Sequence, residues 1–178
     1  MSLPALPPGV GMRLLAPTDA VALAQAYRDN REHLSPWEPL RDDAYFTEAG
    51  QADQIAGKLA GLASGTEVPW VLTSDHRIVG TITLSGIVRG PFLNAHVGYW
   101  VDARLQGRGV GSAALHRAAH RARGPLGLHR IQASVLPHNE PSKAVLLRAG
   151  FTLIGTAPAY LSIAGRWQDH LLYQRILH

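Results

Sequence analysis

The 178-residue chain contains no cysteine, which excludes a disulfide framework and a thiolate zinc site. No apolar run approaches the ~18 residues of a membrane-spanning helix. The segment 1–12 also lacks the basic and apolar regions of a secretory signal. We therefore expect a cytoplasmic protein in a reducing compartment, with no membrane partner.

A metal site is not expected either, although the chain has nine histidines. His116 and His120 have the i, i+4 spacing of two ligands on one helix, but no carboxylate accompanies them. They share their predicted helix face with Arg117 and Arg121, which is typical of a solvated surface.

Lysine is scarce: two lysines and fifteen arginines stand against thirteen acids, which gives a net charge of +4. Residues 29–48 hold six acids and two bases, whereas residues 103–148 hold eight bases and one acid, Glu140. This separation predicts a basic half for an anionic ligand and a more acidic lip elsewhere. Direct nucleic-acid binding is not expected, because no basic run is interleaved with stacking aromatic residues.

A hydrophobic content of 46% at this length is typical of one globular domain. We expect residues 1–11 to form a proline-rich tail and residues 12–178 to form a single α+β domain. The pattern predicts helices at 18–31 (with Thr18 as N-cap), 47–62, 112–122 and just before Gly150, and strands at 12–16, 70–73, 78–84, 95–102, 129–136, 151–156 and 170–176. Connections of three kinds are expected: a hairpin turn at 74–77, a rigid loop between prolines at 33–40, and a loop holding Tyr160 and Trp167.

The stretch Gln106–Ser112 joins the predicted strand at 95–102 to the helix that follows it. The first turn of a helix has unpaired N–H groups and a partial positive charge, so it suits a phosphate group. Gly107, Gly109 and Gly111 leave out the Cβ atoms that would hold a pyrophosphate away from the backbone. Arg104 and Arg108 are expected to add positive charge.

Two phosphate-binding motifs can be weighed against this stretch. A P-loop requires a glycine followed by lysine, and no glycine here precedes one. Residues 109–114 do satisfy the dinucleotide pattern G-x-G-x-x-A. However, the position about 20 residues later falls at His129 and Arg130, which offer no carboxylate for a ribose.

A third motif fits better: Q-x-x-G-x-G at 106–111, then Asn139-x-x-Ser142, then Gly150-Phe151. This arrangement resembles the GNAT superfamily of acetyl-CoA-dependent acyltransferases over nearly the whole chain. The segments at 34–39, 88–90, 98–100, 137–139, 160–161 and 167–170 further resemble the RimJ/RimL group, which acetylates N-terminal amines of ribosomal proteins. The block around Trp37 is most similar to the ribosomal-protein-alanine branch of that group.

The resemblance implies a central mixed, mostly antiparallel sheet of about six to seven strands, flanked by helices and splayed between the fourth and fifth strands. It implies acetyl-CoA as co-substrate. The loop amides suit its pyrophosphate, and the edge of strand 95–102 suits the amide-bearing arm. The predicted coenzyme A contacts are Tyr99, Trp100, Val101, Gln106, Gly107, Arg108, Gly109, Val110, Gly111, Ser112, Asn139 and Ser142.

Acyl transfer needs a neutral amine, a polarised thioester carbonyl and protonation of the leaving thiolate. Leu146 stands where many relatives have a tyrosine for this task, so Ser142 or a water molecule is the candidate proton donor. A capping role for Ser142 remains the alternative. Glu38 is the candidate base and Asp169 the second choice. The predicted acceptor-binding residues are Trp37, Glu38, Tyr160 and Asp169.

We therefore expect an N-acetyltransferase that acts on a protein N-terminal α-amine, with a ribosomal protein as one candidate, by direct transfer in a ternary complex. Two alternatives stay open: acetylation of a small amine such as a polyamine or antibiotic, and a non-catalytic module that binds acyl-CoA or associates with the ribosome. The expected partners are coenzyme A and a protein N-terminus. The sequence leaves open a monomer or a homodimer.

Overall fold

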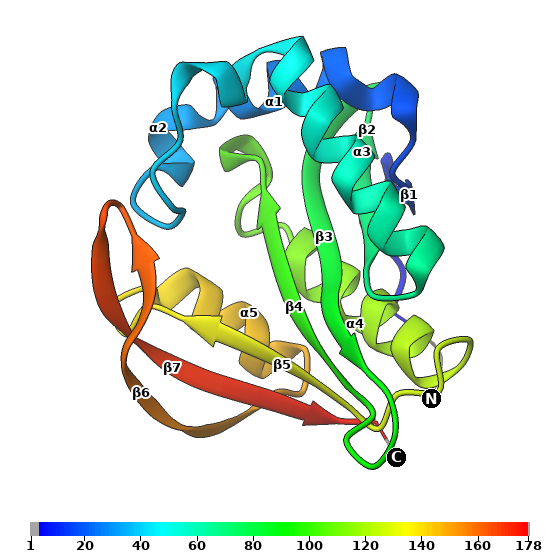
Figure 1. Cartoon of the computed structure of the whole chain (residues 1–178), viewed down its shortest axis with the longest axis vertical. Coiled ribbons are helices and arrows are strands. Elements are labelled where there is room, and N and C mark those ends of the chain that lie inside the picture. Colours follow the sequence, from blue (N-terminus) through cyan, green and yellow to red (C-terminus); the bar gives the residue numbers. More distant parts are fainter. Residues whose placement is uncertain (1–3, 178) are drawn as a thin grey trace.

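The computed structural model describes residues 4–177, which form a seven-stranded sheet with helices on both faces (Figure 1). The strand order is β1-β2-β3-β4-β5-β7-β6. The strands are β1 (Val10–Leu14), β2 (Val68–Ser74), β3 (Arg77–Val88), β4 (Asn94–Val101), β5 (Arg130–Val135), β6 (Thr152–Ile163) and β7 (Arg166–Ile176). β4 and β5 run parallel and the other neighbouring pairs run antiparallel, so the predicted mixed sheet is confirmed.

The parallel pair β4–β5 separates soon after it begins. Asn94, Ala95 and His96 pair with β5, whereas the rest of β4 pairs with β3 alone among the described residues. Figure 1 shows β4 and β5 in contact near the C-terminus and diverging towards the opposite end. The predicted splay between the fourth and fifth strands is therefore confirmed, and it leaves one edge of β4 open.

Different helices cover the two faces of the sheet (Figure 1). α1 (Ala20–Asp29), α2 (Arg31–Leu34) and α3 (Glu48–Ser64) lie on the side of β2 and β3, and α4 (Val110–Arg123) and α5 (Glu140–Arg148) lie on the other face. Short 3₁₀ segments cover Pro17–Asp19, Asp43–Phe46 and Ala103–Leu105. One core lies between the sheet and α4 and α5, where Leu115 and Ala118 are fully buried, and a second lies under α1 and α3 around Ile55.

The N-terminal elements differ from the prediction. β1 begins at Val10, inside the predicted tail; residues 1–3 of that tail and residue 178 lie outside the described residues. The prediction of Thr18 as a helix cap is wrong, because Thr18 lies within a 3₁₀ turn and Asp19 instead accepts the amide of Ala16 at 2.8 Å. A salt bridge from Arg13 at 2.7 Å fixes that carboxylate.

The prediction of a loop holding Tyr160 and Trp167 is also wrong, because both residues lie within the long β6–β7 hairpin. Its turn uses Ala164 at φ 49° and Gly165 at φ 80°. Alanine rarely adopts this left-handed region, so local sequence rules give no signal for such a turn. The amide of Ala164 donates to the carbonyl oxygen of Glu38 at 2.9 Å, so the hairpin tip reaches the loop that follows α2.

Candidate active site

The glycine stretch has the conformation that an anion site requires. Gly107 and Gly109 have φ of 72° and 77°, and a Cβ at either would point into open space. Gly109 is the N-cap of α4 and has no side chain to satisfy the first-turn amides, so these N–H groups remain available to a ligand. Gly111 differs, because a Cβ there would lie 3.2 Å from Val145 and 3.8 Å from Tyr99. Gly111 therefore allows α4 to pack closely, rather than only clearing space for phosphate.

A cleft of about 580 Å³ opens beside this loop, between the free edge of β4 and the first turns of α4 and α5. Of the predicted coenzyme A contacts, all except Arg108 line it. The full lining is His33, Leu34, Trp37, Tyr99, Trp100, Val101, Leu105, Gln106, Gly107, Gly109, Val110, Gly111, Ser112, Asn139, Pro141, Ser142, Ala144, Val145 and Arg148.

The hydrogen bonds at the two ends of β4 fix which of its backbone groups face the gap. The amide of Asp102 donates towards β3 at 2.8 Å, and the carbonyl of Leu93 accepts from the Arg130 amide at the start of β5 at 3.1 Å. Because successive residues of a strand direct their backbone groups to opposite edges, Tyr99 and Val101 direct theirs into the gap. The open edge thus presents donors and acceptors to a ligand with peptide-like amides.

Trp100 contributes to the cleft differently from its neighbours. Its side chain is 8% exposed and lies on the α1 and α3 side, where the indole Nε1 donates to the Tyr27 hydroxyl at 3.1 Å. Its backbone groups face β3 by the same alternation. Trp100 therefore fixes the edge of β4 from behind, while Tyr99 and Val101 present the backbone groups that a ligand can reach.

Arg104 does not add net positive charge beside the loop as predicted, because its guanidinium is paired with a carboxylate. Arg104 donates to the 2%-exposed carboxylate of Asp102 at 2.6 Å and lies 3.8 Å from Asp29. Asn30 adds a hydrogen bond to Asp102 at 3.2 Å and accepts from the Ala103 amide at 3.0 Å. The hydrogen bonds from Arg104 hold the pKa of Asp102 well below its usual value. This cluster anchors the start of the loop and neutralises Arg104.

Arg148 was not identified from the sequence, yet it lines the cleft from the last turn of α5. Its side chain is exposed, as is that of Arg108, and neither forms a salt bridge within residues 4–177. The predicted contact Gln106 places its Nε2 3.0 Å from the ring of His33. The two arginines are the charges beside the loop that remain available for phosphate.

The first turn of α5 settles which residue caps this helix. The side-chain oxygen of Asn139 accepts the Ser142 amide at 3.1 Å, so Asn139 is the N-cap and the Ser142 hydroxyl is not. The carboxamide nitrogen of Asn139 makes no hydrogen bond to another described residue. The Ser142 Oγ lies 2.9 Å from the hydroxyl of Tyr99. Burial raises the pKa of that hydroxyl to about 12, although the hydrogen bond to Ser142 opposes this.

Trp37 and Glu38 are neighbours in the loop after α2, but only Trp37 is among the residues that line the cleft. Trp37 lines the cleft, and its ring lies 5.5 Å from that of His138. Burial raises the pKa of the Glu38 carboxyl, and the nearby Arg41 only partly opposes this effect. That carboxylate makes no hydrogen bond or salt bridge to the rest of residues 4–177. A desolvated carboxylate is a stronger base near neutral pH than an exposed one.

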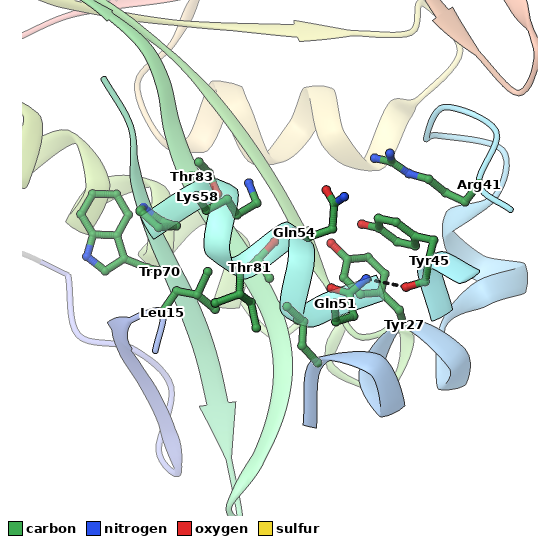
Figure 2. Close-up of a pocket in the computed structure, with 13 residues that line it drawn as sticks. Leu15, Tyr27, Arg41, Tyr45, Gln51, Gln54, Lys58, Trp70, Thr81 and Thr83 are labelled. Atoms are coloured by element: carbon green, nitrogen blue, oxygen red, sulfur yellow. Dashed lines mark hydrogen bonds between the residues drawn. The ribbon is translucent and has the colours of Figure 1, made fainter. Parts of the chain in front are cut away.

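A second, smaller pocket of about 140 Å³ lies beneath α3 (Figure 2). Tyr27 and Tyr45 line it together with Arg41, whose guanidinium lies 4.3 Å from the Tyr45 ring centre. The Gln51 amide donates to the Tyr45 carbonyl at 2.6 Å, which fixes this wall. The Tyr27 hydroxyl also accepts the hydrogen bond from the Trp100 indole. The pocket therefore lies behind the part of β4 whose open edge lines the main cleft.

The remaining predicted acceptor residues, Tyr160 and Asp169, line neither pocket, and the same holds for Glu38. The carboxylate of Asp169 accepts the Ala159 amide at 2.8 Å, where Ala159 has φ of 45°. The Tyr160 ring lies 5.8 Å from His170, which is 3% exposed and donates from Nδ1 to the Gln168 carbonyl at 2.9 Å. These contacts shape the β6–β7 hairpin.

Residues 4–177 contain neither a cluster of metal-ligating side chains nor a helix that could span a membrane. No group of three or more histidine, cysteine, aspartate or glutamate side chains there is arranged to hold a metal ion. No helix in the same part of the chain is long and apolar enough to cross a membrane.

The splayed β4–β5 pair with an uncapped helix N-terminus beside it defines an acetyltransferase of the GNAT type. The family model described as "Acetyltransferase (GNAT) domain" matches residues 10–152, and the chain belongs to this family.

Within this family, the chain is similar to proteins of the RimJ/RimL group. The chain is 34% identical over 163 residues to "[Ribosomal protein uS5]-alanine N-acetyltransferase" of Escherichia coli, covering 90% of this chain and 84% of that protein. Among solved structures, a ribosomal-protein-S5-alanine acetyltransferase from Vibrio fischeri has a TM-score of 0.90 and 36% identity, covering 94% of this chain and 93% of the other. Mycobacterium smegmatis RimJ, in complex with CoA-disulfide, has a TM-score of 0.89 and 34% identity over 94% of this chain and 81% of its own. The predicted resemblance is confirmed, and the chain is an N-acetyltransferase.

Proposed function

We propose that this enzyme transfers the acetyl group of acetyl-CoA to the N-terminal α-amine of a protein, with a ribosomal protein as the first candidate. The observation that supports this most strongly is the single cleft shared by the open β4 edge and the uncapped start of α4. The names of the relatives from Escherichia coli and Vibrio fischeri support the choice of acceptor.

The pyrophosphate and the pantetheine arm of coenzyme A each have a matching surface at the cleft. The first-turn amides of α4 suit the pyrophosphate, and the arginines at 108 and 148 supply the charge around it. The backbone groups of Tyr99 and Val101 suit the amides of the pantetheine arm, as an added strand pairs with a sheet edge. Asn139 can donate its free carboxamide nitrogen to the same arm. These contacts would carry the thioester into the gap between β4 and β5.

The transfer then needs three groups around the thioester. The Val101 amide can polarise the carbonyl oxygen, and the Ser142 hydroxyl can stabilise the departing thiolate. Glu38 can accept the proton that the amine loses, because burial has raised the pKa of its carboxyl. In this direct mechanism the amine attacks acetyl-CoA within a ternary complex, without an acetylated protein side chain.

An α-amine suits this site better than a lysine side chain. An α-amine has a pKa of ~7.7–8.0, whereas a lysine side chain has a pKa of ~10.4. At pH 7, roughly a tenth of α-amines but well under a thousandth of lysine side chains are therefore neutral. A single partly buried carboxylate is a modest base, which is sufficient for an amine that is already partly neutral. The exposed acids around Glu38, such as Glu32 and Asp42, would attract a cationic peptide.

The test is transfer to a synthetic peptide with a free alanine N-terminus and an internal lysine. We expect acetylation at the α-amine and not at the lysine, as located by fragment mass spectrometry. Glu38→Gln should lower kcat, whereas Glu32→Gln, which removes an exposed acid of the same segment, should affect only KM through steering that weakens as salt rises. Transfer mainly to the lysine, or to spermidine with the peptide inert, would contradict the proposed acceptor.

A further inference from the structure

The hydroxyl groups of Tyr99 and Ser142 meet across the inner end of the cleft, although they come from different elements. Tyr99 belongs to β4 and Ser142 to the first turn of α5, and both line the cleft. Their oxygen atoms lie 2.9 Å apart. This contact joins the two walls at the place where the thioester sulfur would leave.

The hydrogen of the Tyr99 hydroxyl has two acceptors, both on Ser142. The Oγ at 2.9 Å is nearer than the backbone carbonyl oxygen at 3.3 Å. Because burial raises the pKa of Tyr99 to about 12, the hydroxyl keeps its proton at neutral pH and can act as a donor. When Tyr99 donates to Oγ, the only proton of Ser142 is free to point into the cleft.

The packing around Tyr99 gives this contact a fixed geometry. The Tyr99 ring passes close to Gly111, where an added Cβ would lie 3.8 Å from the ring and 3.2 Å from the Val145 side chain. Leu146, at the position where many relatives have a tyrosine, is 1% exposed and carries no hydroxyl. In this chain the phenol beside Ser142 therefore comes from the strand.

We propose that Tyr99 is a positioning residue: its hydroxyl donates to Ser142 and thereby directs the Ser142 hydrogen towards the sulfur of the departing coenzyme A. This inference rests on the proposed acetyltransferase function and adds a residue to it. Donation from Tyr99 also polarises the Ser142 hydroxyl and strengthens the hydrogen bond that Ser142 gives in turn.

The reaction balances without a change in the protonation of Tyr99. The amine nitrogen forms the new C–N bond, the C–S bond breaks, and its electron pair goes to sulfur. The nitrogen loses one proton through Glu38 and the thiolate can gain one from solvent. Ser142 lowers the energy of the developing thiolate through its hydrogen bond. Tyr99 only orients and polarises the Ser142 hydroxyl.

A double-mutant cycle tests the pairing. Tyr99→Phe keeps the ring and removes the hydroxyl, and we expect kcat to fall roughly three- to tenfold, as for the loss of one hydrogen bond. Ser142→Ala should lower kcat by more, about a hundredfold or above. In the Ser142→Ala background, Tyr99→Phe should have no further effect on kcat, because the Ser142 hydroxyl that Tyr99 orients is already gone. Tyr173→Phe, which removes a hydroxyl from a core tyrosine outside the cleft, should leave kcat unchanged.

A binding measurement separates this inference from the proposed function. Wild-type protein should bind coenzyme A more tightly than desulfo-coenzyme A, and Tyr99→Phe should reduce that ratio several-fold while leaving desulfo-coenzyme A affinity unchanged. If the wild type acetylates no amine, the proposed function fails, yet this ratio still tests the pairing. Equal losses of kcat in both Ser142 backgrounds, or an unchanged binding ratio, would overturn the positioning role.

Discussion

The carboxylate of Asp102 holds the guanidinium of Arg104 at 2.6 Å, directly between the end of β4 and the glycine stretch. The carboxylate is buried and also accepts from Asn30 on the far side of the strand. The same aspartate thus fixes both the open strand edge and the loop that would hold the pyrophosphate. Stability and coenzyme binding are therefore expected to depend on it together.

Asp102→Asn should lower the free energy of unfolding by about 1.5–3 kcal/mol at neutral pH, since hydrogen bonds to a charged group are lost. The pKa of Asp102 is lowered in the folded state. The contribution of the Asp102 charge to the free energy of unfolding is thus fully present above the unfolded carboxyl pKa of ~3.9. This contribution is lost as the pH falls below that value towards the folded pKa. Denaturant unfolding of both proteins from pH 7 to pH 3 measures this, and the difference between them should shrink over the acid part of the range.

The matched control is Asp53→Asn, which removes an exposed acid of α3. Its effect on unfolding should be small and nearly independent of pH. A constant difference between wild type and Asp102→Asn down to pH 3 would show that the charge of Asp102 is not what stabilises the loop.

Gly109→Val should abolish the stabilisation of the protein by acetyl-CoA. A bound ligand at a hundredfold excess over Kd adds about 2.7 kcal/mol to the native state. The new side chain would stand where the phosphate approaches, and a φ of 77° would also be strained for valine. Thermal unfolding with and without acetyl-CoA measures both effects.

Gly90→Val controls for the strain, because Gly90 has φ of 72° and open space around it but lies outside the cleft. This variant should lose stability yet keep the full ligand-induced shift. A shift with a nicotinamide dinucleotide and none with acetyl-CoA would instead favour the dinucleotide-binding interpretation of the glycine stretch.

Asn139 is the N-cap of α5 and the proposed donor to the coenzyme A arm, and Asn139→Ser separates these two roles. Serine caps a helix about as well as asparagine, so the free energy of unfolding should change by only a few tenths of a kcal/mol. The lost carboxamide donor should weaken acetyl-CoA binding by roughly three- to tenfold. Asn139→Ala should lose both the cap, at about 1 kcal/mol, and the affinity; calorimetric titration and unfolding distinguish the two. If Asn139→Ser binds acetyl-CoA as well as the wild type, Asn139 only caps the helix.

Glu38 should show opposite effects on stability and activity. Because burial raises the pKa of its carboxyl in the folded state, its contribution to stability is lost as the pH rises through that folded value. Glu38→Gln should therefore be at least as stable as the wild type at neutral pH while its kcat falls. The acid limb of the wild-type pH–rate profile should lie above the pH of an ordinary glutamate and should disappear in the variant. A variant that unfolds more easily would contradict this account of Glu38.

Features that depend on neighbouring residues could be predicted from the sequence. The hairpin turn at 74–77 is observed, with Asp75 and His76 at φ of 47° and 63°. The conformation of Gly107 and Gly109 follows equally from local chemistry, because glycine alone adopts positive φ without cost.

Features that depend on distant contacts could not be predicted. The burial of Asp102, which pairs with Arg104, involves a hydrogen bond from Asn30, 72 positions away, and the contact of Tyr99 with Ser142 joins residues 43 positions apart. The hydrogen bond that Asp169 accepts from the Ala159 amide likewise depends on the pairing of β6 with β7. In each case the deciding partner is brought by the tertiary fold, about which spacing along the chain carries no information.

The central claim is that the physiological acceptor is a protein α-amine, and mass spectrometry of cellular protein N-termini tests it most directly. Cells that produce the wild-type protein should be compared with cells that produce the Gly109→Val variant at the same level. We predict that one or a few alanine N-termini, a ribosomal protein among them, are acetylated only with the wild type, while lysine acetylation is unchanged. Identical N-termini in the two samples, with the difference found instead on lysines or on small amines, would contradict the account.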